Sequence, residues 1–263
     1  MAALAVMQRE GLAPATRARV HGTLAGLCAH LVRQGHLRVD PLIAAGVERP
    51  KLPKSLPRYV ERDGEMARVL AVTGTLDPEG RLTWPERDLA MAAVLAGTGA
   101  RASEVCGVRL RDLVLDVEDP YMRVTGKGGA VRDCPLPLEV VAAVQTYLDS
   151  RKERTKARAR RDDPVWLNNH ERPLTPAALD HLVRRWFARA GVPLPREAAA
   201  HAFRHTVAMQ LVGRGEAVNV VQALLGHASL SSTQIYIRAA GHHVREAAHA
   251  LPIRGQLRKM VGT

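Results

Sequence analysis

Four short segments of the sequence carry side chains whose types and spacing suit phosphoryl transfer: GTGARASE, TGKGG, HAFRHT and LLGHASLSSTQIY. The candidate residues, in chain order, are Arg101, Glu104, Lys127, His201, Arg204, His227 and Tyr236. A guanidinium group matches a phosphate bidentately and stabilises the charge that spreads over its oxygens during transfer. Histidine and lysine side chains can move protons, and a phenol can attack phosphorus when cations and a base activate it. Together these segments predict a site that acts on a phosphodiester.

Each candidate taken alone also has an ordinary structural explanation. A lysine in a glycine-rich turn is usually solvated, and a single tyrosine usually packs in a core or an interface. His201 and His205 have the spacing of half a zinc site, but position 202 is Ala where a zinc protease motif has Glu, and no third ligand follows convincingly. Six such residues in a fixed order over roughly 135 positions favour one shared site instead.

In this order and spacing the segments resemble the signature of the tyrosine recombinase family, which includes phage integrases and Xer-type enzymes. That signature is an Arg in a G-x-R-x-x-E context, a hairpin Lys, His-x-x-Arg, a His in an L-G-H box and a Tyr. The resemblance is dense over residues 58–240 and looser over 11–57. It implies a site-specific DNA recombinase, an integrase of the mobile-element type, that needs no metal, ATP or other cofactor.

The resemblance also implies a role for each candidate. Tyr236 attacks the phosphodiester and forms a 3′-phosphotyrosyl intermediate with a free 5′-hydroxyl, while Arg101 and Arg204 clamp the non-bridging oxygens. His201 is the base-like partner of the nucleophile, and Lys127 is the general acid for the departing 5′-oxygen.

Two further residues complete the set that the resemblance implies. His227 donates a hydrogen bond to the phosphate. Glu104 is expected to orient Arg101 or to pack structurally rather than to react.

The net charge of +12 and the pI near 10.4 are typical of a protein that binds a polyanion. The excess lies in two regions, residues 1–58 and residues 151–161, each with a net charge of +6. Aromatic residues make up only 3%, which disfavours base stacking and points to double-stranded DNA. A solvated helix face is the ordinary alternative for residues 151–161. Candidate contacts to the DNA backbone are Arg17, Arg19, Lys51, Lys54, Arg58, Arg151 and Lys152.

Hydrophobic periodicity predicts a mainly α fold with a small antiparallel β-sheet (α+β), a tyrosine recombinase catalytic-domain-like core preceded by a short helical segment. A helix is expected over 14–34, helices over much of 59–110, strands over 113–117, 121–125 and 131–134, and helices again from 138 with a break at 162–175. Ser231 or Ser232 is expected to cap a short helix that carries Tyr236, and 244–251 is expected to form an amphipathic tail helix.

The Pro-punctuated basic segment over 49–58 indicates a linker between two parts. We expect residues 1–57 to form a partial helical DNA-binding segment with this linker, and residues 58–263 to form the catalytic domain with a C-terminal helical tail. The sequence has no membrane-length apolar run and no recognisable secretory signal, and its three isolated cysteines suggest no disulfide framework. These features predict a cytoplasmic protein.

The expected partners are double-stranded DNA, further copies of the same chain in a homo-oligomer (a tetramer) on DNA, and accessory proteins. Two alternatives remain open at this point. One is a non-catalytic or regulatory DNA-binding relative, which the short front segment favours. The other is strand relaxation of the type IB topoisomerase kind, which uses the same constellation.

Overall fold

The computed structural model describes residues 6, 7, 9–50, 64–80, 83–194 and 199–226 of the chain. Contacts divide the chain into two compact units, residues 1–55 and 56–263. The boundary expected after residue 57 lies in the 51–63 segment, outside the described residues.

The first unit is built on helix α2 (Pro14–Arg33), followed by the short helix α3 (Pro41–Ala44). Pro14 occupies the first turn of α2, where its missing N–H removes no helical hydrogen bond, and Gly35 follows the helix with φ +75°. The Nε2 atom of His21 on α2 lies 3.1 Å from the carbonyl oxygen of Val47. This contact connects α2 to the chain that leaves α3, and the helix predicted over 14–34 is confirmed.

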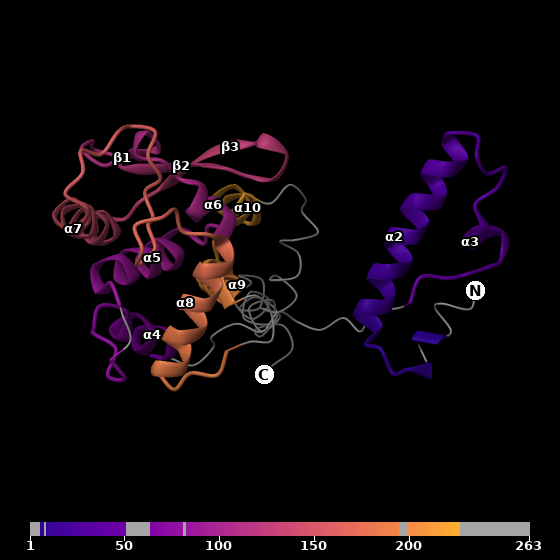
Figure 1. Ribbon diagram of the computed structural model, residues 1–263, viewed down its shortest axis with the longest axis horizontal. Helices are drawn as coiled ribbons and strands as arrows, with labels where there is room; N and C mark the ends of the chain where they lie inside the picture. The colour runs from indigo at the N-terminus through magenta and orange to yellow at the C-terminus, as the bar shows by residue number, and fades with distance from the viewer. Residues whose placement is uncertain (1–5, 8, 51–63, 81–82, 195–198, 227–263) are drawn as a thin grey trace, which may run out of the picture. The chain divides into compact units, whose positions relative to one another are not determined.

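The second unit contains seven described α-helices: α4 (Glu65–Thr73), α5 (Pro85–Thr98), α6 (Ala102–Gly107), α7 (Leu138–Thr155), α8 (Pro176–Arg189), α9 (Ala199–Gly213) and α10 (Val218–Leu225). Helix α5 is central, because it packs against α4, α7 and α9 (Figure 1). Its apolar residues are buried around much of its circumference, as expected for a helix with neighbours on several sides. None of the described helices is long and apolar enough to cross a membrane.

A small antiparallel sheet lies next to α6, with strand order β1 (Leu113–Val114), β2 (Tyr121–Thr125) and β3 (Val131–Pro135). A single turn of 3₁₀ helix precedes it (η1, Leu110–Asp112), and a glycine-rich turn joins β2 to β3 (η2, Lys127–Gly129). The prediction of a mainly helical fold with a small antiparallel sheet is confirmed. Strand β1 is shorter than predicted, because the partner strand begins at Tyr121 and the preceding Pro120 has no N–H to extend the ladder.

The core of the second unit is organised around aromatic side chains. All three tryptophans of the chain are buried there, at Trp84, Trp166 and Trp186. Tyr147 on α7 lies between two of them, edge-on to Trp84 at 5.4 Å and stacked on Trp166 at 5.2 Å between ring centroids. Edge-to-face and offset stacked pairs of this kind stabilise a core beyond the area that they bury.

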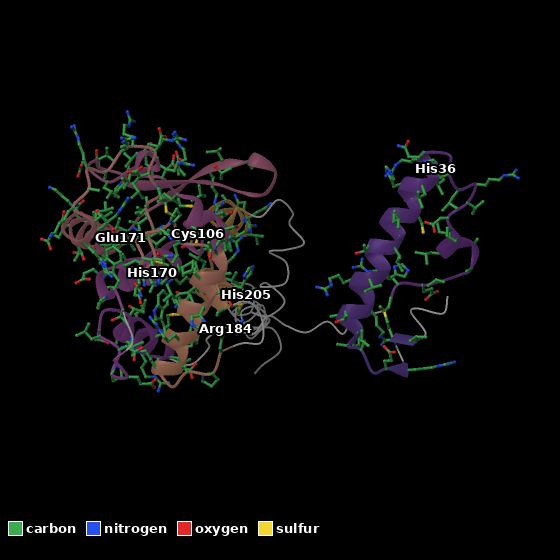
Figure 2. The ribbon with its side chains drawn as sticks, viewed as in Figure 1. His36, Cys106, His170, Glu171, Arg184 and His205 are labelled. Atoms are coloured by element: carbon green, nitrogen blue, oxygen red, sulfur yellow. The ribbon has the colours of Figure 1, made fainter. Side chains whose placement is uncertain are left out.

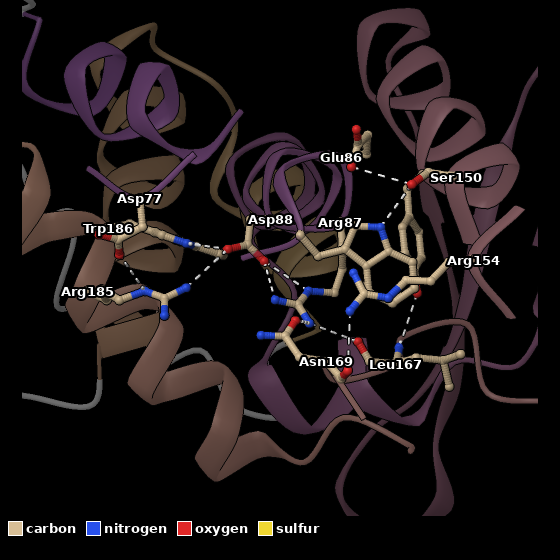
Figure 3. Close-up of polar contacts among 12 residues, drawn as sticks. Asp77, Glu86, Arg87, Asp88, Ser150, Arg154, Leu167, Asn169, Arg185 and Trp186 are labelled. Carbon is tan, nitrogen blue, oxygen red and sulfur yellow. Dashed lines mark hydrogen bonds and ion pairs between the residues drawn. The ribbon is translucent and has the colours of Figure 1, made fainter. Parts of the chain in front are cut away.

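A buried network of charges connects α5 to α8 and to the loop before α8 (Figure 3). Arg87 and Asp88 form an ion pair that is almost completely buried, and Arg87 Nη1 donates to the carbonyl oxygen of Leu167 at 3.1 Å. From α8, Arg185 Nη2 lies 3.6 Å from Asp88 Oδ2, and Trp186 Nε1 donates to the same oxygen at 3.3 Å. Burial is costly for unpaired charges, so this network is stable only when its partners are all present.

Candidate active site

Arg101 stands where α5 ends and α6 begins. Helix α5 stops at Gly99, which has φ +61°, and Arg101 is the extended residue that precedes the first turn of α6. A Cβ at position 99 would lie 2.6 Å from Leu225 Cδ2, so glycine is needed both for the backbone conformation and for the close approach of α10. The GTGAR segment therefore folds as a tight turn that presents Arg101 beside α10.

Arg204 is directed at the same turn from α9. Its guanidinium is buried, with 4% of the residue exposed, and Nη1 donates to the carbonyl oxygen of Gly99 at 2.9 Å. The neighbouring Phe203 and Val207 are buried as well, as the helical spacing of the segment predicts. Arg101 Nη2 donates to the carbonyl oxygen of Gly226 at 3.1 Å. The two arginines that lie 103 positions apart are thus both bound to backbone carbonyls around one turn.

Glu104 is bonded to Arg101 through both its side chain and its backbone. Its buried carboxylate accepts hydrogen bonds from Arg101 Nη1 at 2.6 Å and from the backbone N–H of Arg101 at 2.8 Å. Burial alone would raise the pKa of this carboxyl, but the hydrogen bonds from Arg132 and Arg101 lower it to about 2. Glu104 is therefore ionised at neutral pH and acts as a fixed acceptor.

Lys127 lies in the turn between β2 and β3, as predicted. The turn is closed by a 2.7 Å hydrogen bond from the N–H of Gly126 to the carbonyl oxygen of Ala130, and Gly128 and Gly129 both have positive φ. A Cβ on Gly126 would lie 3.4 Å from Glu104 Oε1, so the backbone just before Lys127 runs beside the Glu104 carboxylate. The side chain of Lys127 lies outside the described part of the structure.

His201 is exposed in the first turn of α9, one turn before Arg204. His205, which Figure 2 labels, follows on the same helix with its ring centroid 6.3 Å from that of His201. Within the described ranges, no group of three or more His, Cys, Asp or Glu side chains could hold a metal ion. His227 and Tyr236 lie outside the described residues, as do Ser231, Ser232 and the expected tail helix.

Sequence reasoning missed one residue of this constellation. Arg132 on β3 directs both terminal nitrogens at Glu104, Nη1 to Oε1 and Nη2 to Oε2, each at 2.9 Å. The available signal was its position on the predicted hairpin, five residues after Lys127, but strand periodicity does not identify a partner on a distant helix.

The predicted contacts to the DNA backbone have different outcomes. Arg19 and Lys152 are exposed, and Arg17 is half-buried. Arg151 is buried, with 7% of its surface exposed, and donates to the carbonyl oxygen of Val165 at 3.3 Å. This burial corrects the prediction for Arg151, whose side chain packs inside the protein because it continues the buried face of α7. Lys51, Lys54 and Arg58 lie outside the described residues.

Comparison with known proteins identifies relatives over most of the chain. A family model described as the phage integrase family matches residues 76–243. The tyrosine recombinase XerC of Myxococcus xanthus is 34% identical over 238 residues, which cover 89% of this chain and 75% of that protein. The tyrosine recombinase XerD of Listeria innocua is 30% identical over 233 residues, covering 89% and 74%.

Solved structures share the fold. The post-cleavage complex of the XerH site-specific recombinase with a palindromic difH substrate superimposes with a TM-score of 0.75 at 22% identity, covering 94% of this chain and 70% of that chain. A lambda integrase dimer bound to a COC′ core site has a TM-score of 0.62 at 19% identity, covering 87% and 77%. The chain belongs to the phage integrase family and is a site-specific tyrosine recombinase, an enzyme that breaks and rejoins DNA strands with a tyrosine nucleophile.

Proposed function

We propose that Tyr236 is the nucleophile of this recombinase and that the phosphate it attacks is bound between Arg101 and Arg204. Attack would break the bond from phosphorus to the 5′-oxygen of the next nucleotide, leaving a 3′-phosphotyrosyl link and a free 5′-hydroxyl. Rejoining would reverse the step with a 5′-hydroxyl as the attacking group. Because the phosphotyrosyl link retains the energy of the broken phosphodiester, the two steps need no nucleotide cofactor.

One observation carries this proposal: Arg101 and Arg204 come from different helices and are both anchored by carbonyl oxygens at or next to the α5–α6 turn. Arg101 binds Gly226 O and Glu104, yet 30% of its side-chain surface stays exposed. Guanidinium groups fixed in this way are pre-organised for the dispersed negative charge of a phosphoryl transition state. Removing one such donor costs roughly 10² to 10³ in rate.

We propose the remaining roles from the residue types in the motifs. We assign His201, exposed one turn before Arg204, as the base-like partner of Tyr236, and His227 as a hydrogen-bond donor to the phosphate. We assign Lys127, in the turn that runs beside Glu104, as the general acid for the departing 5′-oxygen. A hairpin tip suits this role because its lysine can approach the phosphate when DNA is bound.

The test uses nicked suicide duplexes, in which the short fragment that carries the new 5′-hydroxyl diffuses away after cleavage and the covalent adduct accumulates. The wild-type protein should form SDS-resistant adducts, with or without EDTA, and Tyr236→Phe should bind the duplex and form none. Tyr121→Phe is the matched control, because this tyrosine lies on β2 with its ring beneath Arg123 and should not affect cleavage.

Other outcomes would support the alternatives. Adducts that persist in Tyr236→Phe would show that another residue is the nucleophile. DNA binding without adducts on any duplex would favour a non-catalytic relative. Relaxation of supercoiled plasmids without dependence on a site would favour the topoisomerase-like activity.

We propose further that the chain works in the cytoplasm as a homo-oligomer on duplex DNA, and as a tetramer during strand exchange, with accessory proteins as additional partners. The DNA-bound lambda integrase dimer and the XerH complex support assembly on DNA as the mode of action. Exposed basic residues such as Arg19 and Lys152 would contact the phosphate backbone. Light scattering of the protein–duplex complex should give a mass with more than one protein copy, and a single copy at every ratio would contradict the assembly.

A further inference from the structure

We propose that Arg132 is a positioning residue for DNA strand cleavage, which fixes Arg101 through Glu104 and Gly226. This inference rests on the proposed role of Arg101 as a phosphate ligand. Arg132 belongs to β3 and lies in the same hairpin as Lys127, whereas Glu104 belongs to α6 and Gly226 ends α10. One guanidinium therefore contacts two segments that both bind Arg101.

The first contact is the fork between Arg132 and Glu104. The Nη1 and Nη2 atoms of Arg132 donate to Oε1 and Oε2 of Glu104, each at 2.9 Å. This parallel arrangement fixes both the position and the rotation of the carboxylate relative to the guanidinium. Arg101 supplies a second donor to each of these oxygens, its Nη1 to Oε1 and its backbone N–H to Oε2. Without Arg132 the carboxylate would keep one partner for each oxygen and would be free to rotate with Arg101.

The second contact is with Gly226, whose carbonyl oxygen accepts from Arg101 Nη2. A Cβ at Gly226 would lie 2.6 Å from Arg132 Nη1 and 2.7 Å from Cζ, so the plane of the guanidinium rests directly against this glycine. Gly226 has φ +64° and is the last described residue before His227. Arg132 therefore contacts Gly226, which binds Arg101 through its carbonyl oxygen. The next residue in the chain is His227, the proposed hydrogen-bond donor to the phosphate.

The charges of Arg101, Glu104 and Arg132 also favour a role in which Arg132 acts through Arg101. One carboxylate is shared by two guanidinium groups, and the hydrogen bonds to Glu104 raise the pKa of Arg132. Arg132 thus stays cationic, and its side chain is mostly buried, with 17% exposed against 30% for Arg101. Because the Arg101 side chain is the more exposed of the two, it is the better placed to receive a phosphate.

The same hairpin offers a matched control. Arg123 on β2 forms a similar fork with Asp133, at 2.7 and 2.9 Å, but this pair is about half exposed and contacts none of the proposed phosphate ligands in the described structure. If any arginine–carboxylate fork on the hairpin merely stabilises the fold, Arg123→Gln and Arg132→Gln should change cleavage to a similar extent once both proteins are folded.

The experiment measures single-turnover cleavage of a saturating nicked duplex by wild type, Arg132→Gln, Arg132→Lys and Arg123→Gln, below the melting temperature of each. We expect Arg132→Gln to cleave about 10- to 100-fold more slowly, since small errors in the position of a phosphate ligand have effects of this size, with the Kd for the duplex changed by less than about threefold. Arg132→Lys, which keeps one contact to Glu104, should be intermediate, and Arg123→Gln should match wild type.

The pH profile distinguishes positioning from a general loss of stability. With Arg132 removed, fewer hydrogen bonds oppose the effect of burial on the pKa of Glu104, so the carboxyl begins to protonate at higher pH than in wild type. The other titratable groups at this carboxylate are Arg101 and Cys134, and burial raises the pKa of the Cys134 thiol, which stays neutral over this range. The rate ratio of Arg132→Gln to wild type should therefore decrease further as the pH falls from about 8 to about 5. A purely structural role would lower the melting temperature and leave this ratio independent of pH.

A double-mutant cycle tests the contact with Gly226. Gly226→Ala should slow cleavage more in the wild-type background than in Arg132→Ala, because removing the guanidinium removes the collision with the new Cβ. Equal effects in both backgrounds, or an Arg132→Gln protein that cleaves like wild type, would overturn the inference while the proposed function stands. A wild-type protein that forms no adducts would instead overturn the proposed function and this inference with it.

Discussion

Arg204 Nη1 and the carbonyl oxygen of Gly99 are joined by a hydrogen bond of 2.9 Å, which connects α9 to the turn that precedes Arg101. The two motifs that carry the proposed phosphate ligands are thus coupled by one contact between a side chain and the backbone. A change in the backbone at position 99 should displace Arg204 as well as the start of α6.

We predict that Gly99→Ala destabilises the protein by about 2 to 4 kcal/mol, from the strain of a left-handed alanine and from overpacking against Leu225 and Val207. Cleavage by the folded fraction should also be at least about tenfold slower, since Arg204 loses its correct support. Urea denaturation and single-turnover cleavage measure the two effects.

Gly107→Ala serves as the control for this prediction. A Cβ at position 107 would meet no neighbouring atom of the described structure within 4 Å, and Gly107 ends α6 without positive φ. Its substitution should therefore change stability by less than about 0.5 kcal/mol. Equal costs at positions 99 and 107 would contradict the close approach of α10 to the turn.

The Glu104 carboxylate should make a measurable contribution to stability at neutral pH. A pKa lowered from 4.5 to about 2 on folding corresponds to about 3 kcal/mol of stabilisation, at 1.36 kcal/mol for each pH unit. Because the pKa is lower in the folded chain, this stabilisation is complete above about pH 4.5 and is lost as the pH falls through about 2.

Glu104→Gln should therefore be less stable than wild type at pH 7, and the difference in unfolding free energy should shrink as the pH is lowered below about 4. Denaturant titrations of both proteins at several pH values measure this difference. Taking the difference cancels the contributions of all the other carboxyl groups, because both proteins contain them. A difference that stays constant down to the lowest pH at which both proteins fold would contradict the shifted pKa.

Arg151 and Lys152 are neighbours in sequence, but substitution should affect stability at Arg151 and DNA binding at Lys152. Arg151→Ala should cost about 1 to 2 kcal/mol of stability, because it removes a buried donor to Val165 O and the packing of its aliphatic stem. Lys152→Ala should leave stability unchanged and, if it contacts a phosphate, should lower the salt dependence of DNA binding by about one counterion.

Thermal melting together with binding isotherms at several salt concentrations separates these effects. A large loss of stability in Lys152→Ala, or none in Arg151→Ala, would contradict the assignment of the two side chains to surface and interior.

Asp88→Asn should be among the most destabilising single changes in the second unit, at about 3 to 5 kcal/mol, because it leaves the buried Arg87 guanidinium without its counter-charge. Asp133→Asn removes a carboxylate from an exposed pair and should have little effect on stability. Equilibrium unfolding of the two variants compares a buried pair with an exposed one in the same protein.

Sequence reasoning succeeded where a structural feature is encoded locally. The limits of α2 follow from Pro14 and Gly35, and the turn that holds Lys127 follows from its glycines, because these residues restrict their own backbone. The pairing of Arg132 with Glu104 has no local signature, since it joins a strand to a helix 28 residues earlier. It depends on how the hairpin packs against α6, and this is decided by tertiary structure.

Arg151 is an instructive intermediate case. Its place in a run of basic residues predicts a contact to the DNA backbone, yet Val140, Val144, Tyr147 and Arg151 follow the spacing of one helix face, and all four are buried. The helical period was therefore a better guide to the position of this side chain than its charge. The proposed roles of His227 and Tyr236 stay predictions, because these residues lie outside the described part of the chain.

The location of all three tryptophans in the second unit has a practical consequence for spectroscopy. Residues 1–55 contain no Phe, Tyr or Trp, so intrinsic fluorescence and near-ultraviolet circular dichroism report on residues 56–263 alone. Cys28, by contrast, is the single cysteine of the first unit. A fluorophore attached there, excited away from the tryptophans, would follow the first unit independently, so that the response of each unit to DNA could be recorded in the same sample.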